Sequence, residues 1–183
     1  MSCDVDFYHT SHIHSNGLNH LNPQLSCRNS IVCAMPPSRT KIWIHALFGT
    51  RNHKPLIHAA FESHLHAHIR HHLEHDFMCY LQAINGVSDH LHLFFLLNPN
   101  HSVKDVLKNV KGESSHWINE NDFIESKFAW EKGYTAVSVS DSMVSDVERH
   151  IQQQKEYHVS VSYSEECRRF FTLHRLQFRA LAV

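Results

Sequence analysis

The chain has 183 residues and a mass of 21.3 kDa, a length that suits one domain with its own core and is short for two. Its 17 Lys and Arg residues balance 18 Asp and Glu residues to a net charge of -1, so bulk charge gives no sign of a nucleic-acid partner, and any such partner must be found in local patterns. The compositional anomaly is the count of 20 histidines, whose side chains titrate at about pH 6.5.

The five cysteines are odd in number and show neither a CxxC pair nor a zinc-finger spacing. This pattern argues against a disulfide framework and favours a reducing compartment. No stretch approaches about 18 consecutive apolar residues, and the N-terminus lacks the basic start and apolar run of a signal peptide. We therefore expect a soluble, cytoplasmic protein with no membrane partner.

The first 40 residues are rich in Ser, Asn and His, show no sustained apolar period, and close with Pro36 and Pro37. This composition predicts a flexible N-terminal extension over residues 1–40. The texture changes at Lys41, where the stretch KIWIHALFG is apolar on both faces. Such a run predicts a covered central strand.

An amphipathic helix is expected next, because apolar residues recur at every fourth position from Ile57 to Leu73. The stretch FMCYLQAING then predicts a second strand that ends in a hairpin turn at Asn85-Gly86, and SDHLHLFFLL predicts its partner. Ser102 follows an Asn-Pro pair and is expected to cap a second amphipathic helix.

The last third of the domain begins after a loop to Gly133, where YTAVSVS alternates as a fourth strand. Ser142 is expected to cap a helix with one stripe of side chains at Met143, Val147, His150, Gln154 and Tyr157, and YSEECRRFFTLHRLQFRAL allows a further helix. This order predicts an α+β fold of the split βαβ, ferredoxin-like type, βαββαβ, with an additional C-terminal helix. In it, two helices cover one face of an antiparallel sheet and the other face stays open for a site or a partner.

Two histidines stand out inside the predicted third strand. Side chains alternate across a strand, so His90 and His92 share a face and are close enough to hold one divalent ion. The spacing alone is weak evidence, because the same HxH pattern recurs at 12–14, 64–66 and 66–68. The setting distinguishes this pair, since polar side chains in an apolar central strand are costly unless they are satisfied.

A third metal ligand is expected from the stripe on the last helix, which offers His150, Gln154 and Tyr157. A site of mixed nitrogen and oxygen ligands would suit Mg²⁺ or Mn²⁺, with water and phosphate completing the coordination.

Four stretches in this order resemble the HUH-type single-tyrosine transposases of small bacterial insertion sequences, including their REP-associated relatives. They are DHLHLFF after AINGVS, HSVKDVLKNVKGESSHWIN, FAWEKGYTAVSVS, and HIQQQKEYH. The resemblance runs over residues 41–171, which we take as the transposase domain, and leaves a short C-terminal tail at 172–183.

The resemblance implies a homodimer with shared active sites that binds single-stranded DNA hairpins at the ends of its element. It assigns His90 and His92 to the metal, with Gln154 completing the site, and it implies strand cleavage and rejoining through a tyrosine that forms a 5′-phosphotyrosine link. The family pattern in the last helix is Tyr-Ile-x-x-Gln, whereas this chain reads His150-Ile151-Gln152-Gln153-Gln154.

Three explanations of this difference stay open. His150 could attack phosphorus through a ring nitrogen, or Tyr157 could act as the nucleophile if the helix shifted, since it lies about 10 Å further along the axis. Alternatively the chain has lost its nucleophile and is a catalytically impaired DNA-binding relic or repressor. A histidine-rich metal-binding protein without a nucleic-acid role is the remaining reading of the composition.

Basic residues near the first strand and on the second helix are the candidates for contacts to DNA phosphates. They are Arg51, Lys54, Lys104, Lys108 and Lys111.

Overall fold

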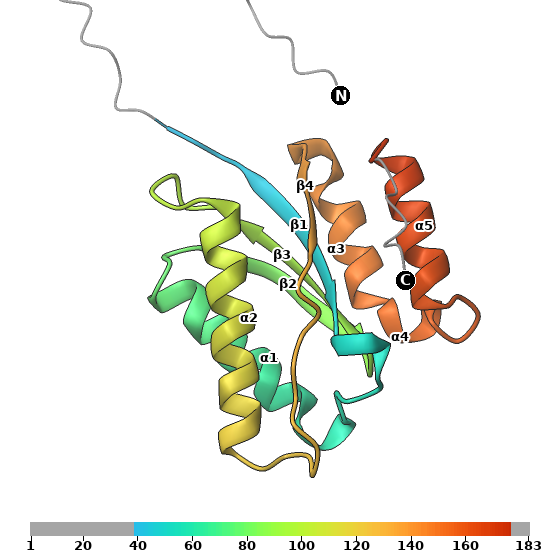
Figure 1. Ribbon diagram of the computed structural model, residues 1–183. Helices are drawn as coiled ribbons and strands as arrows, with labels where there is room; N and C mark the ends of the chain where they lie inside the picture. Colours follow the sequence, from blue (N-terminus) through green and yellow to red (C-terminus); the bar gives the residue numbers. More distant parts are fainter. Residues whose placement is uncertain (1–38, 177–183) are drawn as a thin grey trace, which may run out of the picture. The chain divides into compact units, whose positions relative to one another are not determined.

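Figure 1 shows the computed structural model of the chain, which describes residues 39–176. These residues belong to one compact unit that spans Ser38–Val183. The extension predicted for residues 1–40 therefore falls outside the described residues, apart from Arg39 and Thr40, which are exposed and carry no regular structure. No helix among residues 39–176 combines the length and apolarity that crossing a bilayer requires.

A four-stranded antiparallel sheet forms the centre of this unit. Its strands are β1 (Trp43–Gly49), β2 (Tyr80–Val87), β3 (His90–Leu96) and β4 (Thr135–Val139), in the order β2-β3-β1-β4. The two strands that the sequence marks as apolar on both faces, β1 and β3, are the two central ones, because only central strands are covered on both faces and along both edges. The predicted ferredoxin-like order is confirmed.

Helices α1 (Ala59–His75) and α2 (Val103–Glu120) cover one face of the sheet (Figure 1). Ser102 caps α2 as predicted, since its hydroxyl accepts a hydrogen bond from the amide of Asp105 at 3.1 Å. The main core lies between these helices and the sheet. It includes Phe48, Leu65, Leu93, Phe95 and Leu107, each at most 1% exposed. Burial of these side chains is the main force that holds the two layers together.

The opposite face of the sheet is covered by α3 (Val144–Gln152), α4 (Gln154–Tyr157) and α5 (Tyr163–Leu173) (Figure 1). A second core of Trp43, Ala83, Phe94 and Ile151 joins α3 to the sheet. The expectation of an open face was therefore wrong, because these apolar side chains need cover and the C-terminal third of the chain supplies it.

The last predicted helix also differs in detail. It is interrupted at Gln153, where the backbone departs from helical geometry, so that α3 and α4 are separate helices. Ser142 lies in a short 3-10 helix (Asp141–Met143) and does not cap α3, whose N-cap residue is Met143. The further helix allowed by the sequence is α5, which runs across the predicted 171/172 boundary of the domain.

The hairpin between β2 and β3 turns at Ser88-Asp89 rather than at Asn85-Gly86. Val87 pairs with His90 across this two-residue turn, while Asn85 pairs with His92 inside the ladder. Gly86 serves a different purpose, because a Cβ atom at this position would lie 2.2 Å from the carbonyl oxygen of His90. The glycine permits a close approach of two backbones beside the histidine pair.

Replacing Gly86 with alanine is expected to destabilise the fold by about 2 kcal/mol, because the clashing atom belongs to backbone that cannot move alone. Gly112→Ala is the matched control, since Gly112 is exposed inside α2 and nothing lies within 4 Å of its added Cβ. It should stabilise the protein by about 0.5–1 kcal/mol. Urea unfolding of both variants checks the pair, and a Gly86→Ala protein as stable as the unmodified chain would contradict the close approach.

Candidate metal centre

His90 and His92 lie side by side on the face of β3 that α3, α4 and α5 cover, and both are 0% exposed. Their partners in β1 are Gly49 and Leu47, so the histidines lie between the two central strands, at the end where β3 begins and β1 ends. A rigid central strand therefore holds both imidazoles in a site closed to bulk solvent.

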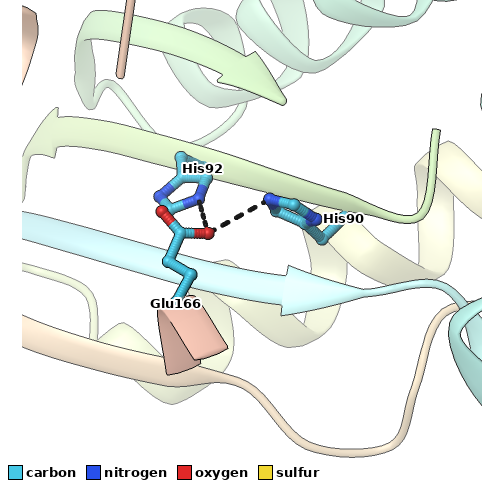
Figure 2. Close-up of side chains that lie close together, drawn as sticks. All are labelled: His90, His92 and Glu166. Atoms are coloured by element: carbon cyan, nitrogen blue, oxygen red, sulfur yellow. Dashed lines mark hydrogen bonds and ion pairs between the residues drawn. The ribbon is translucent and has the colours of Figure 1, made fainter. Parts of the chain in front are cut away.

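The third group of the site is Glu166, which comes from α5 and is 3% exposed. Its Oε2 atom lies 3.3 Å from Nε2 of His90 and 3.3 Å from Nε2 of His92 (Figure 2). One ligand atom from each of these three residues lies within 4.8 Å of the other two. Two imidazoles and a carboxylate at this spacing are a donor set that fits a divalent metal ion.

Sequence reasoning did not find Glu166, although one signal was present. In α5 the residue lies three positions after Tyr163 and four before Phe170, and Phe170 is buried. A carboxylate on the inner stripe of an amphipathic helix needs partners, which are the site histidines here.

Gln154 and His150 join the same cluster, as their place on the predicted stripe indicated. Gln154 is 0% exposed, its Oε1 lies 3.3 Å from Nε2 of His90, and its Nε2 donates to Oε1 of Glu166 at 3.0 Å. Nε2 of His150 lies 3.2 Å from the same Oε1 atom of Glu166. The described chain thus brings the predicted residues together without a second subunit.

His158 is a further residue that the sequence did not single out. It follows α4, and its Nε2 lies 3.0 Å from Oε2 of Glu166 and 3.1 Å from Oε1 of Gln154. Its ring centroid is 4.5 Å from that of His90.

Tyr157 lies at the edge of the cluster and is half-buried. Its hydroxyl accepts a hydrogen bond from Nη1 of Arg169 at 3.3 Å, and its ring centroid is 5.3 Å from that of His150. Tyr157 and His150 both line a groove of about 760 Å³ between β4, α3 and α5, and Glu166 also reaches this groove. The remaining wall of the groove is mostly apolar, with Met143, Val147, Phe170 and Leu173 among its residues.

The two ligand histidines have different electrostatic surroundings. Burial lowers the pKa of His92 to about 4, and contact with Glu166 offsets this only in part. Burial also disfavours the charged form of His90, but hydrogen bonds to Asp89 and Glu166 outweigh it and raise the pKa of His90. For Glu166, burial is outweighed by contacts with His150, His90 and His92, which hold its pKa well below the usual range. The carboxylate is therefore ionised inside a closed cluster of imidazoles.

The predicted phosphate-binding residues lie directly after β1 and on α2. Arg51, Lys54, Lys104 and Lys108 are exposed, as a role in DNA contacts requires. Lys111 differs, because it is 8% exposed and its ammonium donates to the carbonyl oxygens of Lys132 at 3.3 Å and Gly133 at 2.6 Å. With Lys104, Lys108, Trp130 and Tyr134 it lines a groove of about 390 Å³ beside α2.

Comparison with known sequences decides the family. The family described as "Transposase IS200 like" matches residues 38–154, which hold the whole sheet, His90, His92, His150 and Gln154. The chain belongs to this family. Among curated proteins none matches this transposase.

Two solved structures share the fold of this transposase. One is the crystal structure of a protein from Deinococcus radiodurans R1 that is provisionally assigned as a transposase. Its sequence is 20% identical to this chain, and the TM-score is 0.51, with 66% of this chain and 98% of that chain covered. A REP-associated tyrosine transposase bound to a REP hairpin is 11% identical, with a TM-score of 0.53, covering 69% of this chain and 75% of that one.

Proposed function

We propose that this transposase binds single-stranded DNA hairpins at the ends of its element and cleaves and rejoins strands there with a divalent ion, Mg²⁺ or Mn²⁺. The observation that carries the proposal is the meeting of His90 and His92 of β3 with Gln154 in one buried cluster. The REP-associated relative holds a REP hairpin in its structure, which supports a hairpin as the ligand.

His90, His92 and Gln154 would hold the ion, which when bound supplies Lewis-acid polarisation of the scissile phosphate. The protein supplies the rest. The sheet and α4 fix the position of the ligands, while α5 limits access of water to the cluster. The groove next to it offers Arg169 as a cation for a phosphate and apolar walls for the adjoining nucleotide.

Attack by a tyrosine oxygen would form a bond to phosphorus and release the 3′ oxygen of the preceding nucleotide, and reversal of this step rejoins a strand without ATP. His150 occupies the position four residues before Gln154 from which this attack is expected, near the end of α3. Its Nε2 is in contact with Glu166 and Gln154, so it faces the cluster. Tyr157 is the alternative nucleophile, because its hydroxyl opens into the same groove.

A catalytically impaired DNA-binding relic or repressor is the second candidate. It is favoured by one observation, the histidine at position 150, because a phosphoramidate link at a ring nitrogen differs in reach and reactivity from a phosphotyrosine.

The DNA surface and the assembly are parts of the same proposal. Arg51, Lys54, Lys104 and Lys108 would contact phosphates, and Lys111 would shape the groove beside α2. A cytoplasmic homodimer with shared active sites would form if two chains exchanged α3, α4 and α5, since the same contacts would then join different subunits. A mass measurement in solution tests this part by itself.

The function is tested by incubating the full chain at neutral pH with Mn²⁺ and labelled single-stranded hairpins from the ends of its element. A covalent protein–DNA band in denaturing gels that His90→Ala abolishes is the expected result for an active site, and mapping the linked peptide distinguishes His150 from Tyr157. The His64→Ala variant, which changes an exposed histidine of α1, is the matched control. Hairpin binding without any adduct supports the second candidate, and the absence of both contradicts the proposal.

A further inference from the structure

We infer that His158 and Glu166 are metal ligands of this site, so that three imidazoles and a carboxylate bind a first-row transition ion such as Zn²⁺, Co²⁺ or Mn²⁺ in preference to Mg²⁺. The inference deepens the proposed function, on which the presence of a metal in this site rests. It concerns which residues bind the ion and which ion they select.

The first observation is the convergence of three ring nitrogens on one point. Nε2 of His90, His92 and His158 lie 3.3, 3.3 and 3.0 Å from the same atom, Oε2 of Glu166. Ligand atoms about 2.0–2.1 Å from a tetrahedral ion are about 3.3 Å apart, so these separations are those between neighbouring ligands of one ion.

The second observation is the hydrogen bonding of the other nitrogen in each ring. Nδ1 of His90 donates to Oδ1 of Asp89 at 2.7 Å, and Nδ1 of His158 donates to the carbonyl oxygen of Val161 at 2.7 Å. A neutral ring that donates through Nδ1 carries a lone pair on Nε2. Both lone pairs then face the carboxylate oxygen, which is itself an acceptor, and a cation between them satisfies all three groups.

His92 completes the same arrangement. Its Nδ1 lies 3.0 Å from Nε2 of His45, a buried histidine of β1. When His92 donates to His45, its Nε2 also carries a lone pair toward Glu166. Each of the three rings thus has an outer partner at Nδ1, which is the pattern that fixes the tautomer of histidines bound to metals.

The donor set determines the choice of ion. Imidazole nitrogens suit Zn²⁺, and a nitrogen-rich site binds Co²⁺ more tightly than Mn²⁺, whereas Mg²⁺ prefers an octahedron of oxygen ligands. Among residues 39–176, His90, His92 and Glu166 are the one group of three His, Cys, Asp or Glu residues whose ligand atoms all lie within 4.8 Å of one another, and Nε2 of His158 lies 3.0 Å from Oε2 of Glu166. A surplus of exposed histidines elsewhere requires a control in any binding measurement.

Titration of the full metal-free chain with Co²⁺ tests the inference without DNA. One tight site is expected, with the strong visible absorption of a low-coordinate Co²⁺ ion, and excess Mg²⁺ should not displace it. His158→Ala and Glu166→Gln should each weaken Co²⁺ binding by about tenfold or more and shift the absorption bands, since even outer partners of metal ligands contribute about 10–100-fold. His64→Ala is the control for surface binding and should leave the tight site unchanged.

Unchanged affinity and spectrum in His158→Ala would overturn the role of His158, and equal competition by Mg²⁺ would overturn the choice of ion. If the variants fail to fold, pulsed electron paramagnetic resonance of Mn²⁺ in the unmodified chain counts the bound imidazole nitrogens, and two instead of three contradicts the inference. Hairpin binding in a gel-shift assay is measured separately, so a failure of the proposed DNA function is distinguishable from a failure of the metal assignment.

Discussion

Replacing His150 by tyrosine is expected to give this transposase a strong gain in covalent adduct formation with hairpin DNA. Position 150 lies four residues before Gln154, and its side chain reaches both the buried cluster and the neighbouring groove. The side chain is 38% exposed, so the groove side has room for the larger ring. A phenol oxygen placed there would lie at the point from which attack on a bound phosphate is expected.

The expected gain is about 10³-fold or more, because the loss of a nucleophile from another covalent-catalysis site costs about 10⁶-fold. The yield of the denaturation-resistant adduct, measured at equal protein and DNA concentrations, gives the ratio. Arg149→Tyr is the matched control, since it places the same side chain one residue earlier on an exposed position of α3. An unmodified chain that already forms as much adduct through Tyr157 would contradict the loss of the nucleophile at position 150.

Removing the carboxylate of Glu166 is expected to have the largest effect on stability in the absence of metal. The side chain is 3% exposed and its two oxygens contact His90, His92, His150 and His158 and accept a hydrogen bond from Gln154. Without metal, the buried rings of His90 and His92 can donate to Glu166 through Nε2, and Glu166→Ala removes this acceptor. Breaking a buried pair from one side costs about 3–5 kcal/mol.

Urea unfolding in the presence of a chelator measures this loss. Glu165→Ala, on the same helix, is the control, because its carboxylate pairs with Arg168 and Arg169 near the surface, where ion pairs contribute little. A Glu166→Ala protein as stable as the control would show that α5 is not held to the sheet through this carboxylate. A detached α5 would also expose Phe170, so binding of a hydrophobic dye offers a second readout.

The two central strands were predictable because a covered strand must be apolar on both faces, and β1 and β3 are the stretches that meet this condition. The first two helices followed from their apolar period, and the cap at Ser102 from local hydrogen bonding. The hairpin turn was misplaced because Asn-Gly favours a turn locally, whereas the register of β2 and β3 places Gly86 inside the ladder for its small size.

The sequence by itself determined the ferredoxin-like order, the shared face of His90 and His92, and the stripe that carries His150 and Gln154, because each depends on the periodicity of one element. Only the tertiary structure decided that α3, α4 and α5 cover the second face of the sheet, and that Glu166 and His158 join the histidine pair. The contacts of His90 with Gln154 and of His92 with Glu166 join residues 64 and 74 positions apart in the chain, and no local pattern encodes them. They form because the apolar face of the sheet must be covered and because a buried carboxylate must find partners.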